Sequence, residues 1–329
     1  MFSSLLLGVV AFPLSDIDTH QLLPPNSTMV VELHVRRLAS EPVLKRIVCL
    51  AGTQLYGKLL SRFQLPEDAL DELSDLLQKI GIDFWTDVER VTMAGRPRPG
   101  WSPFIVLRGD FSRRRLQAAI GRLEQEYPER IRTEVQDSLE VWQWLPGREG
   151  PGWHVVLLDA HTLVLSPSRQ IVNEAADRAL HPQGRPSPPL QLLLERGRSN
   201  HLATFVMDGP ALLESLPRDF PSESALLNLP ENARNVRAVG LGVYFDKGIK
   251  LHMSLHMNCA DSTRKMRAQL CRWRYEGVSQ IKIYYPKGNQ CIAKALLGLR
   301  FSSDGTVLSM CAALPAETVG QIRQAIAAK

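Results

Sequence analysis

The sequence lacks the motifs that most readily identify a function. It contains no Gly-x-Ser-x-Gly, no phosphate-binding loop ending in Gly-Lys-Ser/Thr, no His-Glu-x-x-His and no Gly-x-Gly-x-x-Gly. These patterns mark hydrolases, nucleotide-binding proteins, metalloproteases and dinucleotide-binding domains. Gly240-Leu241-Gly242 lies in an apolar run that predicts a strand, where glycine indicates close packing or a bulge. The sequence therefore predicts no catalytic residue and no cofactor.

Cysteine is scarce and is not arranged as a metal site. No Cys-x-x-Cys pair occurs, and the last four cysteines are spaced by 12, 20 and 20 residues, which matches no zinc pattern. An odd number of cysteines also fits poorly with a complete disulfide framework. The five are Cys49, Cys259, Cys271, Cys291 and Cys311. We expect them to be small core residues and predict no metal.

A long apolar run and a large charge excess are also missing. The residues at 1–13 are apolar but too few to span a bilayer as a helix, and no other run approaches that length. They fit the apolar core of a secretory signal, although no Lys or Arg precedes them, and they fit equally an N-terminal strand or buried segment. The net charge of +5 is spread along the chain and indicates mainly that the protein is kept in solution by its charge.

What the sequence does contain is a recurring unit of strand, strand and helix. Residues 88–95 and 104–109 alternate or run apolar, and Ser112 then opens a helix with apolar side chains on one face. Residues 236–245 and 249–257 repeat the hairpin around Asp246-Lys247-Gly248, and a basic helix follows from about Ala260. Tight hairpins favour antiparallel pairing.

The cleanest single helix is predicted at residues 66–80. Its apolar residues are spaced by three or four positions, and Gly81 follows where a helix commonly ends. Looser hairpins are expected at 139–165 and at 296–313, the latter turning at Ser302-Ser303-Asp304-Gly305.

The Pro-rich stretch at 182–189 divides the chain, because it can continue neither a helix nor a central strand. We therefore expect an N-terminal segment at 1–23, a first half at 24–181, a linker with a short helix at 182–200 and a second half at 201–329. The predicted fold class is α+β, with two similar halves, each a mostly antiparallel sheet of hairpins with amphipathic helices on one face.

Two histidines in the second hairpin are candidate ligand-binding residues. His252 and His256 share one polar face of a predicted strand, which could line a shallow binding groove. At ~3.3 Å per residue they lie roughly 13 Å apart, too far for one metal ion.

Arginine-rich helix starts are the other candidates. Arg113 and Arg114 open one helix, and Arg264, Arg267 and Arg272 lie in the other. Such stretches bind anionic surfaces or polymers through phosphate or carboxylate contacts, and they equally fit a solvated helix face.

A carboxylate pair is the last candidate. Asp83 and Asp87 flank Phe84-Trp85, a spacing that suits acid/base chemistry and, more commonly, turn capping.

Some of these patterns resemble a known group of proteins. Gly81-Ile82-Asp83, the strand ending in Arg108-Gly109-Asp110-Phe111, and Leu314-Pro315-Ala316-Glu317 after Asp304-Gly305 are similar to uncharacterised bacterial proteins common in planctomycete-type genomes. Those proteins carry domains of unknown function and are usually predicted to be exported or envelope-associated. The resemblance implies no activity and no site residues.

Three functional hypotheses follow. The first is a non-enzymatic binding or scaffolding protein of the cell envelope. The second is a hydrolytic enzyme built around Asp83 and Asp87 or the His252 and His256 face. The third is a binder of anionic polymer or nucleic acid through the arginine-rich helices. The ligand, the partners and the oligomeric state are not predicted.

Overall fold

The strands form one antiparallel sheet that runs through the whole molecule. The computed structural model describes residues 17–40, 75–96, 102–136, 139–145, 152–181, 186–197, 201–215, 234–245, 248–284 and 297–315. Their strands are β1 Met29–Leu33, β2 Val88–Gly95, β3 Phe104–Gly109, β4 Ile131–Gln136, β5 Leu139–Trp144, β6 Trp153–Asp159, β7 Thr162–Ser166, β8 Ala203–Asp208, β9 Val236–Phe245, β10 Gly248–Met257, β11 Arg300–Asp304 and β12 Val307–Pro315.

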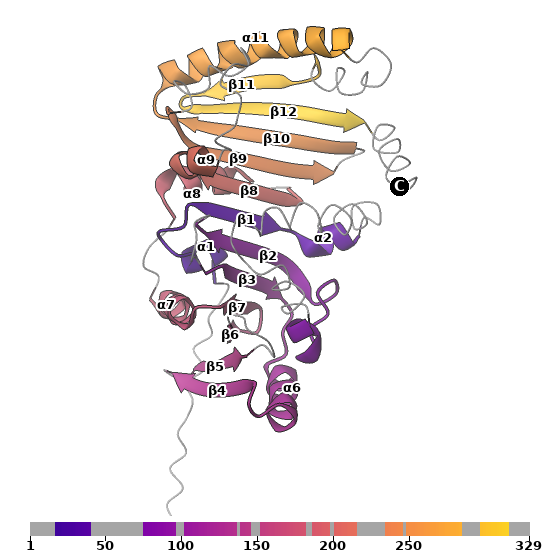
Figure 1. Ribbon diagram of the computed structural model, residues 1–329, viewed down its shortest axis with the longest axis vertical. Coiled ribbons are helices and arrows are strands. Elements are labelled where there is room, and N and C mark those ends of the chain that lie inside the picture. Colours follow the sequence, from indigo (N-terminus) through magenta and orange to yellow (C-terminus); the bar gives the residue numbers. More distant parts are fainter. Residues whose placement is uncertain are drawn as a thin grey trace, which may run out of the picture.

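The 12 strands are stacked along the long axis of the molecule (Figure 1). Their order is β11-β12-β10-β9-β8-β1-β2-β3-β7-β6-β5-β4, and every neighbouring pair is antiparallel. The antiparallel α+β class predicted from the hairpins is thus confirmed.

Seven labelled helices accompany the sheet in the part of the chain that the structure describes. They are α1 Thr19–Leu22, α2 Val35–Ala39, α6 Arg113–Glu126, α7 Arg169–Leu180, α8 Pro188–Gly197, α9 Gly209–Ser215 and α11 Ala260–Tyr284. Residues 75–79 form a further helical stretch. No helix among the described residues is both long and apolar enough to cross a membrane.

The two faces of the sheet carry separate hydrophobic cores. Along β3, Ile105 and Leu107 pack with α6, residues 75–80 and α9, whereas Phe104 and Val106 pack with α1, α7 and α8. We call these the α6 face and the α8 face. Because side chains alternate along a strand, both faces of such a central strand must be apolar, and all four residues are buried.

At the β11 end of the sheet the α6 face is covered by α11. Met266 on this helix is buried against Val239, Leu255 and Leu308 of the sheet. Val239 pairs with Met207, which belongs to the core beneath α6, so α6 and α11 lie on the same face.

Two features of the predicted fold are corrected. The sequence predicted a sheet in each half, but β1 pairs with β8 in register, Val30 opposite Val206, and joins all the strands into one sheet. It also predicted helices on one face, but α1, α7 and α8 lie on the face opposite to α6 and α11. Periodicity defines the apolar side of each helix and leaves open which face of the sheet receives it.

The segment between the predicted halves is packed against the sheet. In α8, Leu190, Leu193 and Leu194 are buried among residues of the α8 face. Pro188 and Pro189 open this helix, a position where the missing amide proton of proline costs nothing.

Helix ends follow the local sequence signals. Gly81 has a φ of +78° and ends the helical stretch, and the amide of Ile82 donates to the carbonyl of Leu77 at 2.9 Å. Ser112 Oγ accepts a hydrogen bond from the amide of Arg115 at the start of α6. The predicted start of the 66–80 helix lies outside the described residues.

Smaller differences concern the edges of the sheet. β4 was not predicted, since Ile131–Gln136 holds only two strongly apolar residues. β11 continues through Ser302, Ser303 and Asp304, which were expected to form the turn, and the chain reverses at Gly305 with a φ of +54°. Edge strands carry polar residues on exposed positions and so resemble turns in sequence.

Candidate functional site

Toward one end of the neighbouring strands β1, β2 and β3, the side chains on the α8 face change from apolar to charged. Val30, Ala94 and Val106 are buried in the α8-face core. The positions that follow on the same face are Glu32 on β1, Thr92 and then Arg90 on β2, and Arg108 on β3, where Arg90 lies opposite Arg108. Such a change from apolar to charged on a covered face calls for a structural or functional reason.

The short helix α1 lies over this end of the strands. Asp18 caps it by accepting a hydrogen bond from the amide of His20 at 3.1 Å. His20 Nε2 then lies 2.8 Å from Glu32 Oε1, and the two residues are only 6% and 3% exposed. A pair this deeply buried depends on both partners, because either group alone would be left desolvated and uncompensated.

Arg108 ties the segment before α1 to the sheet. Its Nη1 donates to the carbonyl of Ile17 at 2.9 Å and to Thr162 Oγ1 at 3.0 Å. The opposite residue, Arg90, has a buried Nε with no hydrogen-bond acceptor among the described residues.

These residues line an open cavity of about 390 Å³, which we call the α1 cavity. It is lined by Ile17, Asp18, Thr19, His20, Glu89, Arg90 and Arg108. Its size falls within the usual range for small-molecule sites, and its lining is mainly polar.

The charges around the α1 cavity shift two pKa values. Burial raises the pKa of Glu32, but the hydrogen bond and charge of His20, with the charges of Arg90 and His34, outweigh burial and leave it below the usual value. For His34, burial first and then the charges of Arg90 and Arg37 lower the pKa to about 4. At neutral pH Glu32 is therefore ionised and His34 is neutral.

A second group of polar side chains surrounds His252. Its ring lies 5.9 Å from the ring of His201, which stacks at 5.3 Å on Tyr244. The Tyr244 hydroxyl lies 3.7 Å from Cys311 Sγ, and Cys311 is directly opposite His252 across β10 and β12.

Gly242 makes the His201 group possible. A Cβ on Gly242 would approach the His201 ring to 2.5 Å, so only glycine lets this ring lie flat on β9. The space here is about 10 Å³, room for one water molecule at most, so the group is packed rather than open to a ligand.

The two histidines predicted from the sequence lie on the α8 face of β10. His252 faces the His201 group, and burial, followed by the charge of Arg196, lowers its pKa. His256 Nε2 lies 3.1 Å from Thr306 Oγ1, and its pKa is lowered by burial and by Arg196 and Arg237. No group of three metal-ligating side chains occurs in the described ranges.

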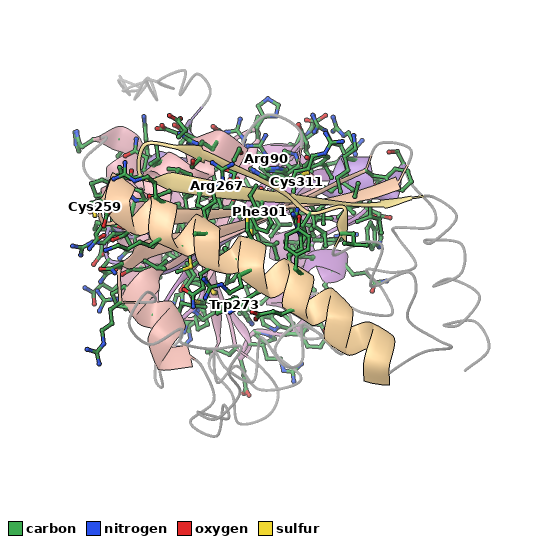
Figure 2. The ribbon with its side chains drawn as sticks, turned by 90° about the horizontal axis from the view of Figure 1, so that it is seen from above. Arg90, Cys259, Arg267, Trp273, Phe301 and Cys311 are labelled. Atoms are coloured by element: carbon green, nitrogen blue, oxygen red, sulfur yellow. The ribbon has the colours of Figure 1, made fainter. Side chains whose placement is uncertain are left out.

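The predicted arginines stay on two separate helices. Arg113 and Arg114 are exposed at the start of α6, near the β4 end of the sheet. Arg264 forms an exposed ion pair with Asp261 at 3.3 Å, Arg267 donates to Ser303, and Arg272 is exposed. Figure 2, seen from the β11 end, shows α11 lying across the molecule with Arg267 labelled upon it.

The carboxylates at Asp83 and Asp87 cap a turn. Asp83 Oδ1 accepts hydrogen bonds from the amides of Trp85 and Thr86, and Asp87 Oδ2 accepts from the amide of Asp83. They precede β2, and β1, β8 and β9 separate that strand from the histidines of β10.

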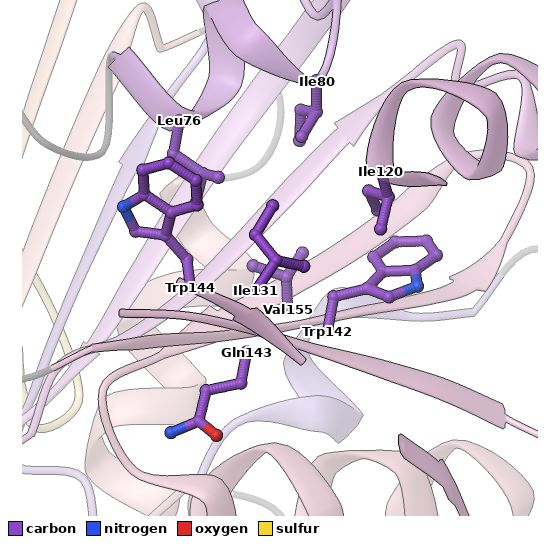
Figure 3. Close-up of a pocket in the computed structure, with 8 residues that line it drawn as sticks. All are labelled: Leu76, Ile80, Ile120, Ile131, Trp142, Gln143, Trp144 and Val155. Atoms are coloured by element: carbon purple, nitrogen blue, oxygen red, sulfur yellow. The ribbon is translucent and has the colours of Figure 1, made fainter. Parts of the chain in front are cut away.

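One further enclosed space is a packing void. Figure 3 shows Trp142 and Trp144 of β5 directed toward Leu76, Ile80 and Ile120, with Gln143 pointing the other way. The void holds about 20 Å³ and has an apolar lining, so it offers a ligand no polar partners.

The α1 cavity was not predicted from the sequence. Its signal was present, since Glu32 and Arg108 continue the alternation of Val30 and Val106 onto a covered face. His20 gave no signal, because a four-residue helix lacks a detectable period. Comparison with protein-family models, curated proteins and solved structures finds no match to this chain.

Proposed function

We propose that this chain is a non-enzymatic binding protein that holds a small charged molecule in the α1 cavity. The observation that carries the proposal is the lining of the 390 Å³ cavity, in which Arg90 and Arg108 lie beside His20. A bound anionic group would pair with the Arg90 guanidinium, and a hydrogen bond to a charged group contributes about 1.5–3 kcal/mol.

Binding rather than catalysis is favoured by what lines the cavity. The one hydroxyl among its lining residues belongs to Thr19, which is buried, and the His20 ring is hydrogen-bonded to Glu32. Because this imidazole already has a partner, it is a poor base for activating the hydroxyl, and we expect the cavity to hold a ligand without attacking it.

The test uses the purified full-length chain and mass spectrometry of what it retains. We expect a small molecule that is recovered unchanged after prolonged incubation, and whose retention falls in Arg90→Gln but not in Arg122→Gln. Arg122 is an exposed arginine of α6 and serves as the matched control. Recovery of a transformed molecule would refute the non-enzymatic part of the proposal, and equal retention by both variants would refute the site.

We also propose that the protein belongs to the cell envelope, in line with the resemblance described above. Subcellular fractionation of the native host, with N-terminal sequencing of the mature chain, is the test. A mature chain that starts at Met1 in the soluble fraction would count against export.

Internal duplication is part of the same proposal. Outward from the central pair, β1 is followed in the sheet by the hairpin of β2 and β3, and β8 is followed by the hairpin of β9 and β10. Each hairpin is followed in the chain by a helix on the α6 face, which is α6 in the first case and α11 in the second. The order supports one duplicated unit, with the additional strands β4 and β5 extending only the first half.

Binding of an anionic polymer is the second candidate, favoured by the exposed basic side chains of α11. Arg264, Lys265, Arg267 and Arg272 are all exposed on this helix, although the first two pair with Asp261. We expect heparin or single-stranded DNA to bind with an affinity that falls steeply with salt. An affinity insensitive to salt, or unchanged in Arg267→Gln with Arg272→Gln, would eliminate this candidate.

A further inference from the structure

The formal charges that line the α1 cavity cancel. Arg90 and Arg108 contribute two guanidinium groups, and Asp18 and Glu89 contribute two carboxylates. Directly beneath, the buried Glu32 carboxylate is paired with His20. The cavity is therefore not a simple anion site, because two carboxylates line it together with the two guanidinium groups.

This balance restricts what the cavity accepts. A free anion would pair with the Arg90 guanidinium but would add negative charge next to Glu32, Asp18 and Glu89. A free cation would be attracted by the carboxylates and repelled by the guanidinium groups of Arg90 and Arg108. A molecule without charged groups would pair with neither the guanidinium groups nor the carboxylates.

We propose that the ligand of the α1 cavity is a small zwitterion of the amino-acid class, whose carboxylate binds Arg90 and whose ammonium group faces the Glu89 side of the lining. This inference rests on the proposed function and specifies its ligand. A carboxylate meets a guanidinium in a planar, paired geometry, which suits Arg90 in particular. The volume of about 390 Å³ limits the ligand to a free amino acid or a short peptide.

Because Glu89 lies beside Arg90, one site can bind both the ammonium group and the carboxylate of the ligand. A bulge interrupts the pairing of β2 with β3 between Val88 and Arg90, so two consecutive residues occupy one step of the ladder. Both Glu89 and Arg90 consequently line the cavity instead of pointing to opposite faces. Among the described residues, the Glu89 carboxylate forms one ion pair, with Arg36 at 3.9 Å.

The experiment is calorimetric titration of the full chain with four kinds of probe. These are the 20 standard amino acids taken singly, acetate, methylammonium and inorganic phosphate. We expect at least one amino acid to bind about tenfold or more tightly than acetate, methylammonium or phosphate. Arg90→Gln should weaken that amino acid about tenfold or more, whereas Arg122→Gln should leave it unchanged.

The variant that decides the inference is Glu89→Gln, chosen because Glu89 is exposed and its removal spares the core. It should weaken binding of the amino acid and leave acetate unchanged or bound more tightly. If acetate or phosphate binds as tightly as any amino acid, and Glu89→Gln strengthens every probe, the ligand is a simple anion and only the zwitterion inference fails. If no probe binds, and thermal unfolding shows that wild type and variants are equally folded, both the inference and the proposed function fail.

Discussion

The buried pair of His20 and Glu32 is where single residues matter most in this molecule. Glu32 is 3% exposed, and its Oε1 lies 2.8 Å from His20 Nε2 of α1. Glu32→Gln should lower the free energy of unfolding by ~3 kcal/mol at pH 7, since it removes one member of a buried charged pair. Denaturant unfolding measures this, with the exposed Glu129→Gln as the control.

The effect of Glu32 should also depend on pH. Its folded pKa lies below the ordinary value of 4.5, so the stability it contributes is present above that pH and is lost as the pH falls through the folded pKa. We therefore expect the difference between wild type and Glu32→Gln to shrink below pH 4.5. A difference that stays constant down to pH 2 would show that the pair is not ionised in the folded protein.

His34 acts in a different pH window. Its folded pKa of about 4 lies below the ordinary 6.5, so the unfolded chain takes up a proton first as the pH falls, and stability is lost between pH 6.5 and 4. With allowance for solvent screening, the loss at pH 5 is about 1 kcal/mol. His34→Gln should abolish this loss without changing the loss below pH 4, which unfolding curves at several pH values would reveal.

Gly242 is the residue on which the His201 group depends. A Cβ there would lie 2.5 to 2.8 Å from three ring atoms of His201, so Gly242→Ala should cost ~2 kcal/mol of stability. In a His201→Ala background the same substitution should cost much less, because the obstructing ring is gone. Equal costs in the two backgrounds would mean that the ring moves aside freely.

At the scale of elements, two helices that start with serine provide a direct comparison. Ser112 Oγ accepts a hydrogen bond from Arg115 at the start of α6, whereas Ser168 at the start of α7 makes no such side-chain bond. Ser112→Ala should therefore lower stability by ~1 kcal/mol and Ser168→Ala by clearly less. Thermal unfolding of the two variants tests this, and similar losses would contradict the role given to the Ser112 cap.

At the scale of the whole molecule, the decisive contact is the pairing of β1 with β8. Val206 is fully buried opposite Val30, at the junction between the parts that the sequence separates. We expect one cooperative unfolding transition, with the same midpoint whether it is followed at Trp153 of β6 or at Trp273 of α11. Val206→Ala should lower the free energy of unfolding by ~2 kcal/mol and shift both midpoints together.

The measurement is tryptophan fluorescence of two variants, in which either Trp153 or Trp273 is the only one of the six tryptophans that is kept. Two separate midpoints, with only one of them shifted by Val206→Ala, would show that the two ends of the sheet unfold independently. Leu241→Ala, at an exposed position of β9, is the control and should shift neither.

The sequence by itself determined many of the elements. Hairpins at 88–109 and 236–257, the serine that opens α6 and the glycine that ends the 75–79 stretch all depend on contacts within a few residues, and such contacts are encoded locally. The antiparallel α+β class followed from them.

Only the tertiary structure decided how the elements meet. The merging of all strands into one sheet depends on β1 and β8, which are separated by some 170 residues, and the placement of helices on both faces depends on which face each loop reaches. The α1 cavity has the same origin, since Asp18 is far in sequence from the hairpin that carries Arg90 and Arg108. Periodicity records which side of an element is apolar, but a contact between distant segments leaves no period in either of them.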